Sequence, residues 1–340
     1  MPLPFRPNCL PAALGALPHS TPRAAWDACV RHLPVILPLP LLAADGEDPA
    51  TLAAQGFGGV TVARDQLQFK RTVALEKLDD LYLAYLRNDV ATRALDLAAL
   101  HEWALREAQI KRAEAVETLL MGPISLALRL VDEDSVPALL DRVLVDALAK
   151  HIHLRLQWEQ SAIGRGVRTP VHWLYEPYLD IVGSPFAPID WPAARQLLEE
   201  TFGATAGVRA VWVGEATDVP ALIESPTVEV VGLPLPLPNV VEAWAPALQG
   251  FIERRGAIGW GIVPQTVEGL AHARVGRLAA RFAAVLRALE EAGLPAADVV
   301  AASLIMPEDT LGRLYPSEAE AALAMVGQLS GLLRHSYDLD

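Results

Sequence analysis

Cysteine is scarce in this chain, and long apolar runs and clusters of basic residues are missing from it. Two cysteines occur among 340 residues, Cys9 and Cys29, which is too few for a disulfide scaffold, so we expect free thiols and a cytoplasmic protein. No segment approaches the roughly 18 apolar residues of a membrane-spanning helix, and prolines break the N-terminus before a signal segment could form. We therefore expect no membrane association.

Basic residues are also in deficit. The chain has 28 Lys and Arg against 41 Asp and Glu, a formal charge of −13. Binding to nucleic-acid phosphates requires clustered Lys and Arg, so we expect no nucleic-acid partner. The hydrophobic fraction of 52% is enough for a large core. Because α/β barrels commonly reach this length as one unit, we expect a single domain spanning residues 1–340.

Short apolar runs alternate with long amphipathic segments along the chain, which is typical of βα units with buried parallel strands. We count eight such runs, so the sequence predicts a (β/α)8 TIM barrel, an α/β fold. Thr21 and Pro22 have the residue types of an N-cap and a first helical position. The predicted strands are Ala12 to Pro18, Val35 to Leu41, Val116 to Ser125, Val171 to Tyr178, Val208 to Gly214, Val228 to Leu235, Ala257 to Pro264 and Val299 to Met306.

The outer helices are predicted where apolar residues recur every three or four positions. These segments are Thr21 to His32, Ser135 to Ile163, Trp191 to Phe202, Val240 to Arg254, Val267 to Ala292 and Ser317 to Arg334.

An irregular excursion separates the second and third predicted strands. Its glycine-rich segment, Gly56 to Val62, lacks the Lys-Ser/Thr of a phosphate loop, and we interpret it as a small hairpin. Helical stretches are predicted near Ala74 to Leu86 and Leu95 to Glu114.

Four short motifs at predicted strand ends resemble the cobalamin-independent methionine synthase (methionine synthase II-like) and uroporphyrinogen decarboxylase superfamily. Gly15-Ala16-Leu17-Pro18-His19 resembles the Gly-Ser-Leu-Pro-His opening of the synthase-like members, and Met121-Gly122-Pro123-Ile124-Ser125 resembles their Thr-Gly-Pro-Ile-Thr. Tyr175-Glu176-Pro177 resembles Asp-Glu-Pro, and Gly261-Ile262-Val263-Pro264 resembles Gly-Val-Val-Pro. The four occur in the family's order across the chain. The resemblance implies a barrel whose C-terminal rim binds a small substrate, with methyl transfer to a zinc-activated thiol in the true synthases.

The residues that the resemblance assigns to zinc are missing. The family's His and Cys after the fifth strand correspond to Trp212 and Gly214, its carboxylate after the sixth strand falls near Pro234, and its last Cys corresponds to Asp309. Only Asp309 has a ligating side chain, whereas zinc sites use three or four protein ligands. We therefore expect a divergent active site, no zinc and no certain cofactor.

The substrate-side residues are altered as well. Ala16 replaces the family's Ser, and Tyr175 replaces the Asp that would receive an amino group, which argues against homocysteine. Arg6 and Arg23 are isolated, so the arginine-rich motif of the decarboxylase branch is not matched. Substrate contacts at the rim are therefore assigned to Gly15, Ala16, Tyr175, Trp212, Glu215 and Gln265.

His19, Glu176 and Asp309 are the candidate catalytic residues, because each follows a predicted strand at the rim. We expect Glu176 to point into the mouth, where His19, Glu176, Glu215 and Asp309 could converge on an oxygen-rich metal site. The alternatives are structural: packing for His19, a buried ion pair for Glu176, and capping for Asp309. Trp173, Tyr175 and Trp212 either line an aromatic pocket or belong to the core.

Two functions remain open. One is a methyltransferase-related enzyme that acts on a small acceptor at the rim without zinc. The other is a non-catalytic barrel that binds a small ligand or a partner protein.

Overall fold

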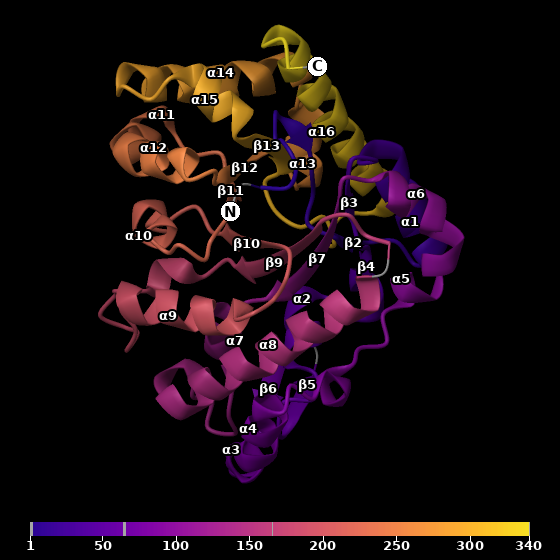
Figure 1. Cartoon of the computed structure of the whole chain (residues 1–340), viewed down its shortest axis with the longest axis vertical. Coiled ribbons are helices and arrows are strands. Elements are labelled where there is room, and N and C mark those ends of the chain that lie inside the picture. Colours follow the sequence, from indigo (N-terminus) through magenta and orange to yellow (C-terminus); the bar gives the residue numbers. More distant parts are fainter. Residues whose placement is uncertain (1–2, 64–65, 165, 340) are drawn as a thin grey trace.

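Eight parallel strands form the central sheet of the computed structural model, which describes residues 3–63, 66–164 and 166–339. Their order is β1-β13-β12-β11-β10-β9-β7-β3, so neighbouring strands follow one another along the chain around a nearly closed ring (Figure 1). This confirms the predicted TIM barrel. The strands are β1 (Leu10–Pro11), β3 (Ile36–Pro38), β7 (Ala115–Met121), β9 (Pro170–Glu176), β10 (Val208–Val213), β11 (Val230–Pro234), β12 (Ala257–Val263) and β13 (Ser303–Pro307).

The ring closes through two short extra strands, β2 (Ala16–Leu17) and β4 (Leu41–Leu42), which pair in parallel. The backbone N–H of Leu41 also donates to the carbonyl oxygen of Gly15 over 2.8 Å. The second predicted strand, Val35 to Leu41, is therefore divided in two, whereas the first, Ala12 to Pro18, contains only β2 and misses β1. Prolines explain the interruption, because Pro38 and Pro40 have no N–H to donate to a neighbouring strand.

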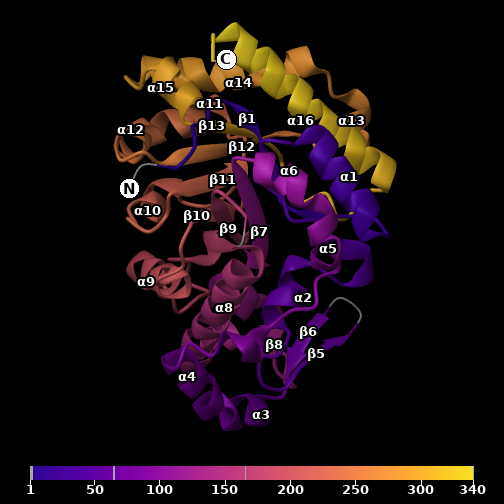
Figure 2. The same cartoon turned by 45° about the vertical axis from the view of Figure 1, so that its right-hand side comes forward.

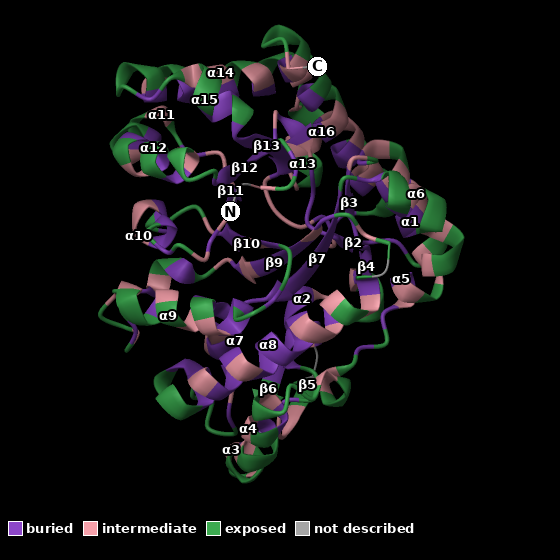
Figure 3. Ribbon diagram, in the orientation of Figure 1, coloured by how far each residue is buried: buried purple, intermediate pink, exposed green. Residues whose placement is uncertain are grey.

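Helices surround the ring, with their buried faces on the sheet and exposed residues outside (Figure 3). Thr21 caps the first helix as predicted, accepting a hydrogen bond of 3.3 Å from the N–H of Ala24. Among the described residues, no helix is long and apolar enough to cross a membrane. The surrounding helices are α1 (Pro22–His32), α7 (Pro123–Arg129), α8 (Arg142–Ile163), α9 (Trp191–Phe202), α10 (Val219–Ile223), α11 (Pro238–Val241), α12 (Ala245–Glu253), α13 (Val267–His272), α14 (Val275–Glu291), α15 (Ala296–Ala301) and α16 (Pro316–Ser336).

Two predicted strands wrongly include residues of neighbouring helices. Val299 and Val300 belong to α15, and Ser125 belongs to α7 rather than to the preceding strand. In both places a proline stands at or just before the first helical residue, where its fixed φ favours helix initiation.

The part of the excursion from residue 60 to residue 86 extends away from the barrel and occupies the lower end of the molecule in Figures 1 and 2, whereas its last helices lie beside α1. The predicted hairpin is present as the antiparallel pair β5 (Val60–Ala63) and β6 (Gln66–Phe69), although it begins later than Gly56 and its turn lies outside the described residues. Strand β8 (Leu130–Val131) extends this sheet. The helices of the excursion are α2 (Pro49–Ala54), α3 (Arg71–Glu76), α4 (Leu78–Leu86), α5 (Ala98–His101) and α6 (Glu107–Arg112).

Candidate functional site at the C-terminal rim

Tyr175 and Asp309 meet across the mouth of the barrel. Tyr175 is the penultimate residue of β9, and Asp309 follows the end of β13, with three strands between them in the sheet order. The Tyr175 hydroxyl donates to Oδ1 of Asp309 over 2.7 Å, and the N–H of Thr310 donates to the same oxygen over 2.6 Å. This bond therefore joins opposite sides of the rim, where barrel enzymes place their chemistry.

Burial raises the pKa of both partners. For Asp309, the bonds from Tyr175 and Thr310 and the charge of Arg313 offset part of the increase. For Tyr175, the negative charge of Asp309 adds to the effect of burial, so the phenol stays protonated and acts as a donor. Among the described residues, no donor reaches Oδ2 of Asp309. This carboxyl group is thus held at one oxygen and open at the other.

Further acidic residues lie on the same side of the rim. Burial raises the pKa of Glu308, and the negative charge of Glu215 raises it further, whereas Arg281 lowers it. Nη1 of Arg281 lies 3.5 Å from Oε1 of Glu308. Glu215, predicted to bind substrate, is exposed near Glu308, and Gln265 is half-buried. The rim therefore carries several carboxylates balanced by Arg281 and Arg313.

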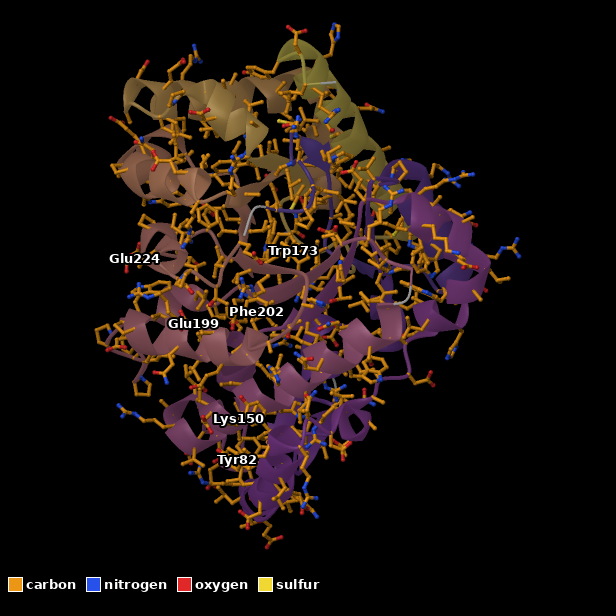
Figure 4. The ribbon with its side chains drawn as sticks, viewed as in Figure 1. Tyr82, Lys150, Trp173, Glu199, Phe202 and Glu224 are labelled. Carbon is orange, nitrogen blue, oxygen red and sulfur yellow. The ribbon has the colours of Figure 1, made fainter. Side chains whose placement is uncertain are left out.

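Two indole rings fill the barrel below the mouth. Trp173 lies near the centre of the barrel in Figure 4, and its ring meets that of Trp212 edge-on with centroids 6.4 Å apart. Both side chains are only 1% exposed. A Cβ atom on Gly232 would lie 2.4 Å from the Trp212 ring, so glycine makes room for the indole. Trp212, predicted to contact substrate, packs in this structure as part of the core.

Glu117 is a buried carboxyl group inside the barrel that the sequence reasoning missed. It is 2% exposed, and its Oε1 accepts a hydrogen bond of 2.8 Å from the indole N–H of Trp173. Its Oε2 is buried without a partner among the described residues. Burial raises the pKa of Glu117 to about 8. The sequence does contain an indication of this buried carboxyl group, because Glu117 is the single charged residue in the apolar strand Ala115–Met121.

Glu176 does not point into the mouth, which corrects the prediction for its orientation. Its Oε1 accepts from the N–H of Ile124 over 3.0 Å and its Oε2 from that of Ser125 over 2.6 Å. The carboxyl group therefore satisfies the first turn of α7, where unpaired N–H groups favour an acceptor. Burial raises its pKa to about 7, against the effect of these bonds. Its neighbour Tyr175 faces the rim instead, since successive strand residues point to opposite faces.

His19 lies between α1 and α16. It is 2% exposed, and its Nε2 is 3.6 Å from Oε1 of Glu320 on α16. Among the described residues, neither ring nitrogen has a hydrogen-bond partner. The preceding residues Gly15 and Ala16 are buried in the closure of the barrel, where a Cβ atom on Gly15 would lie 2.4 Å from the Leu39 carbonyl oxygen.

The four residues expected to converge on a metal do not do so, because His19 contacts Glu320 and Glu176 caps α7. The described part of the chain holds no group of three or more His, Cys, Asp or Glu that could bind a metal ion. The positions that the sequence resemblance assigned to zinc ligands carry Trp212, Gly214, Pro234 and Asp309, and only Asp309 has a side chain that binds metals. The residues present do not fit zinc.

No protein-family model and no curated protein sequence matches the chain. Among solved structures it is similar to a methyltransferase from Methanosarcina mazei, with a TM-score of 0.49 and 14% identity over 91% of this chain and 86% of that one. A B12-independent methionine synthase from a Shewanella species gives 0.48 and 12% over 69% and 68%. A β-mannanase from Alicyclobacillus acidocaldarius gives 0.38 and 10% over 71% and 78%. These similarities are too remote to assign a family or an activity, so the barrel assignment rests on the strand order of the chain itself.

Proposed function

We propose that this protein is a methyltransferase-related enzyme of the methionine synthase II-like kind, acting on a small acceptor at its C-terminal rim without the zinc of that family. The observation that carries the proposal is the bond between Tyr175 and Asp309, which fixes one carboxyl oxygen at the mouth and leaves the other open. The sequence landmarks from Gly15-Ala16-Leu17-Pro18-His19 to Gly261-Ile262-Val263-Pro264 support it, since they lie at or beside strand ends.

Asp309 is suited to act as a general base. A base works best with a pKa near the working pH, and burial moves the pKa of Asp309 upward from the ordinary range of aspartate. In the proposed step, Oδ2 takes the proton from an O–H, N–H or S–H group of the acceptor. The acceptor's heteroatom bonds to the methyl carbon of a folate or corrinoid donor, and the donor leaves with the electrons of the broken bond. Tyr175 holds the carboxylate in place during this transfer.

The test is transfer of labelled methyl from methyltetrahydrofolate or methylcobalamin to homocysteine and to a panel of small thiols, alcohols and amines. We expect turnover of an acceptor other than homocysteine, and Asp309→Asn should lower kcat by about 100-fold or more. A variant that leaves the rim intact, such as Arg277→Ala on α14, is the control. Full activity of Asp309→Asn would refute the role of Asp309. Stoichiometric zinc in the dialysed protein would refute the zinc-free site.

The second candidate is a non-catalytic barrel that binds a small ligand. The packing of Trp173 and Trp212, each 1% exposed, supports the loss of a deep substrate site, so the ligand of this second candidate would bind above the two rings, at the rim. It predicts ligand-dependent thermal stabilisation without turnover, and the stabilisation should survive in Asp309→Asn.

A further inference from the structure

A cavity of about 530 Å³ opens at the N-terminal face of the barrel, opposite the rim. Glu114 and Thr169, which line it, directly precede β7 and β9. Arg6 comes from the N-terminal segment, Arg168 from the turn before β9, and Arg334 from α16. Three segments that are distant in sequence thus bring guanidinium groups to one hollow.

The charge of this cavity is opposite to that of the protein. The chain has a formal charge of −13, yet three arginines and one carboxylate, Glu114, line the cavity. Arg6 and Arg168 make no hydrogen bond or ion pair with any residue that the structure describes. Arg334 is fixed in place, donating to the carbonyl oxygens of Asn8 over 2.9 Å and Leu339 over 3.2 Å. Arg6 and Arg168 alone thus place two guanidinium groups against the single carboxylate of Glu114 in the lining.

Thr169 supplies a second and independent observation. It is only 5% exposed, lines the cavity, and its hydroxyl has no hydrogen-bond partner in the described part of the chain. Its carbonyl oxygen accepts from the N–H of Val116 over 3.0 Å, which holds the residue at the edge of the sheet. The hydroxyl oxygen keeps contact with solvent, so it is free to donate a hydrogen bond to an acceptor atom of a ligand in the cavity.

We propose that this cavity binds a small phosphate monoester. A dianion complements the guanidinium groups of Arg6 and Arg168, and guanidinium groups bind phosphate oxygens in pairs. The volume lies within the range of small-molecule sites, and Phe5, which is 7% exposed, offers an apolar wall for an organic group. The ligand bound here would be separate from the substrate at the rim, so the inference does not depend on the proposed function.

The experiment is calorimetric titration of the full chain at low ionic strength with phenyl phosphate and with inorganic phosphate. We expect phenyl phosphate to bind more tightly. Arg168→Ala should weaken its binding by about 10-fold or more, because hydrogen bonds to charged groups are among the strongest in proteins. Arg6→Ala should act in the same direction, and Thr169→Val should weaken binding by about 3- to 10-fold. Arg6 and Arg168 are exposed, so these two variants should fold normally, which circular dichroism checks.

Two control variants locate the ligand. Arg277→Ala removes an exposed guanidinium on α14, and Arg313→Ala removes one at the rim, and both should bind phenyl phosphate as the parent protein does. Equal weakening in Arg277→Ala would show nonspecific attraction, and loss of binding in Arg313→Ala would place the ligand at the rim. Either result would overturn the proposal, as would no binding by the parent protein at millimolar ligand. Equal affinity for inorganic phosphate would refute the monoester.

Discussion

The indole N–H of Trp173 donates a hydrogen bond to the carboxyl group of Glu117 in the interior of the barrel, over 2.8 Å. Burial raises the pKa of Glu117 from 4.5 to about 8, so the folded protein retains this proton over a pH range in which the unfolded chain has released it. The unfolding free energy must therefore fall as the pH rises through this range, by up to about 1.4 kcal/mol per pH unit.

Glu117→Gln should remove this pH dependence while keeping an acceptor for Trp173. Relative to the parent protein, we expect the variant to gain about 3–4 kcal/mol in unfolding free energy between pH 5 and pH 8. Urea denaturation at several pH values measures the difference, and the other buried carboxyl groups cancel because both proteins contain them. Parallel pH profiles of the two proteins would contradict the raised pKa of Glu117.

Gly122 and Glu176 should be energetically coupled. A Cβ atom on Gly122 would lie 2.2 Å from Oε1 of Glu176, so Gly122→Ala should cost about 2–3 kcal/mol by overpacking. In a Glu176→Ala background the clash is removed, and the same change should cost less than about 1 kcal/mol. Denaturant unfolding of the four proteins gives the coupling energy.

A helical glycine provides the control for this cycle. Gly250 on α12 has open space around its Cα atom, and Gly250→Ala should stabilise the protein by about 0.5–1 kcal/mol. Equal costs of Gly122→Ala in both backgrounds would show that the two residues do not interact as described.

Tyr175→Phe should raise the pKa of Asp309. The hydrogen bond from Tyr175 stabilises the ionised carboxylate and lowers this pKa, so its removal should raise the value by about 0.5–1 pH unit. Carboxyl carbon NMR of aspartate-labelled protein follows the titration, and Asp309→Asn assigns the signal. If an activity needs ionised Asp309, the acidic limb of its pH profile should shift to a correspondingly higher pH. Tyr178→Phe at the same mouth is the matched control, and an equal shift there would argue against a specific bond.

Gly232→Ala should disturb the two indoles that fill the barrel. The added Cβ atom would lie 2.4 Å from the Trp212 ring and 3.0 Å from that of Trp173. We expect a loss of about 1–3 kcal/mol in unfolding free energy together with a changed near-ultraviolet circular dichroism spectrum. Gly276→Ala on α14 is the control: its added Cβ atom would have no neighbouring atom within 4 Å, so the spectrum should stay unchanged. An unaltered spectrum in Gly232→Ala would refute the packing.

The barrel itself was predictable because its strands are continuous apolar runs separated by amphipathic helices. These continuous apolar runs do not indicate which side chains point into the barrel, because a strand buried on both faces shows no alternation of apolar and polar residues. Glu176 was therefore expected at the mouth, where its neighbour Tyr175 lies. The hydrogen bond between Tyr175 and Asp309 could not be predicted from the sequence, although each residue was identified separately. Only the curvature of the ring brings β9 and the end of β13 together. Glu117 could have been identified from the sequence, because it is a lone carboxylate within an apolar strand.

The pairing of β1 with β13 joins Leu10 to Leu304 and Pro11 to Ile305, almost the full length of the chain apart. During synthesis from the N-terminus, β1 has no strand of its own sheet beside it until β13 has left the ribosome. Cys9 and Leu10, which are buried in the finished barrel, must remain uncovered on that side until then. Completion of the ring is thus a late event with a large loop-closure entropy, and a chain that stops before residue 303 would keep an open sheet edge, the kind of edge that promotes aggregation.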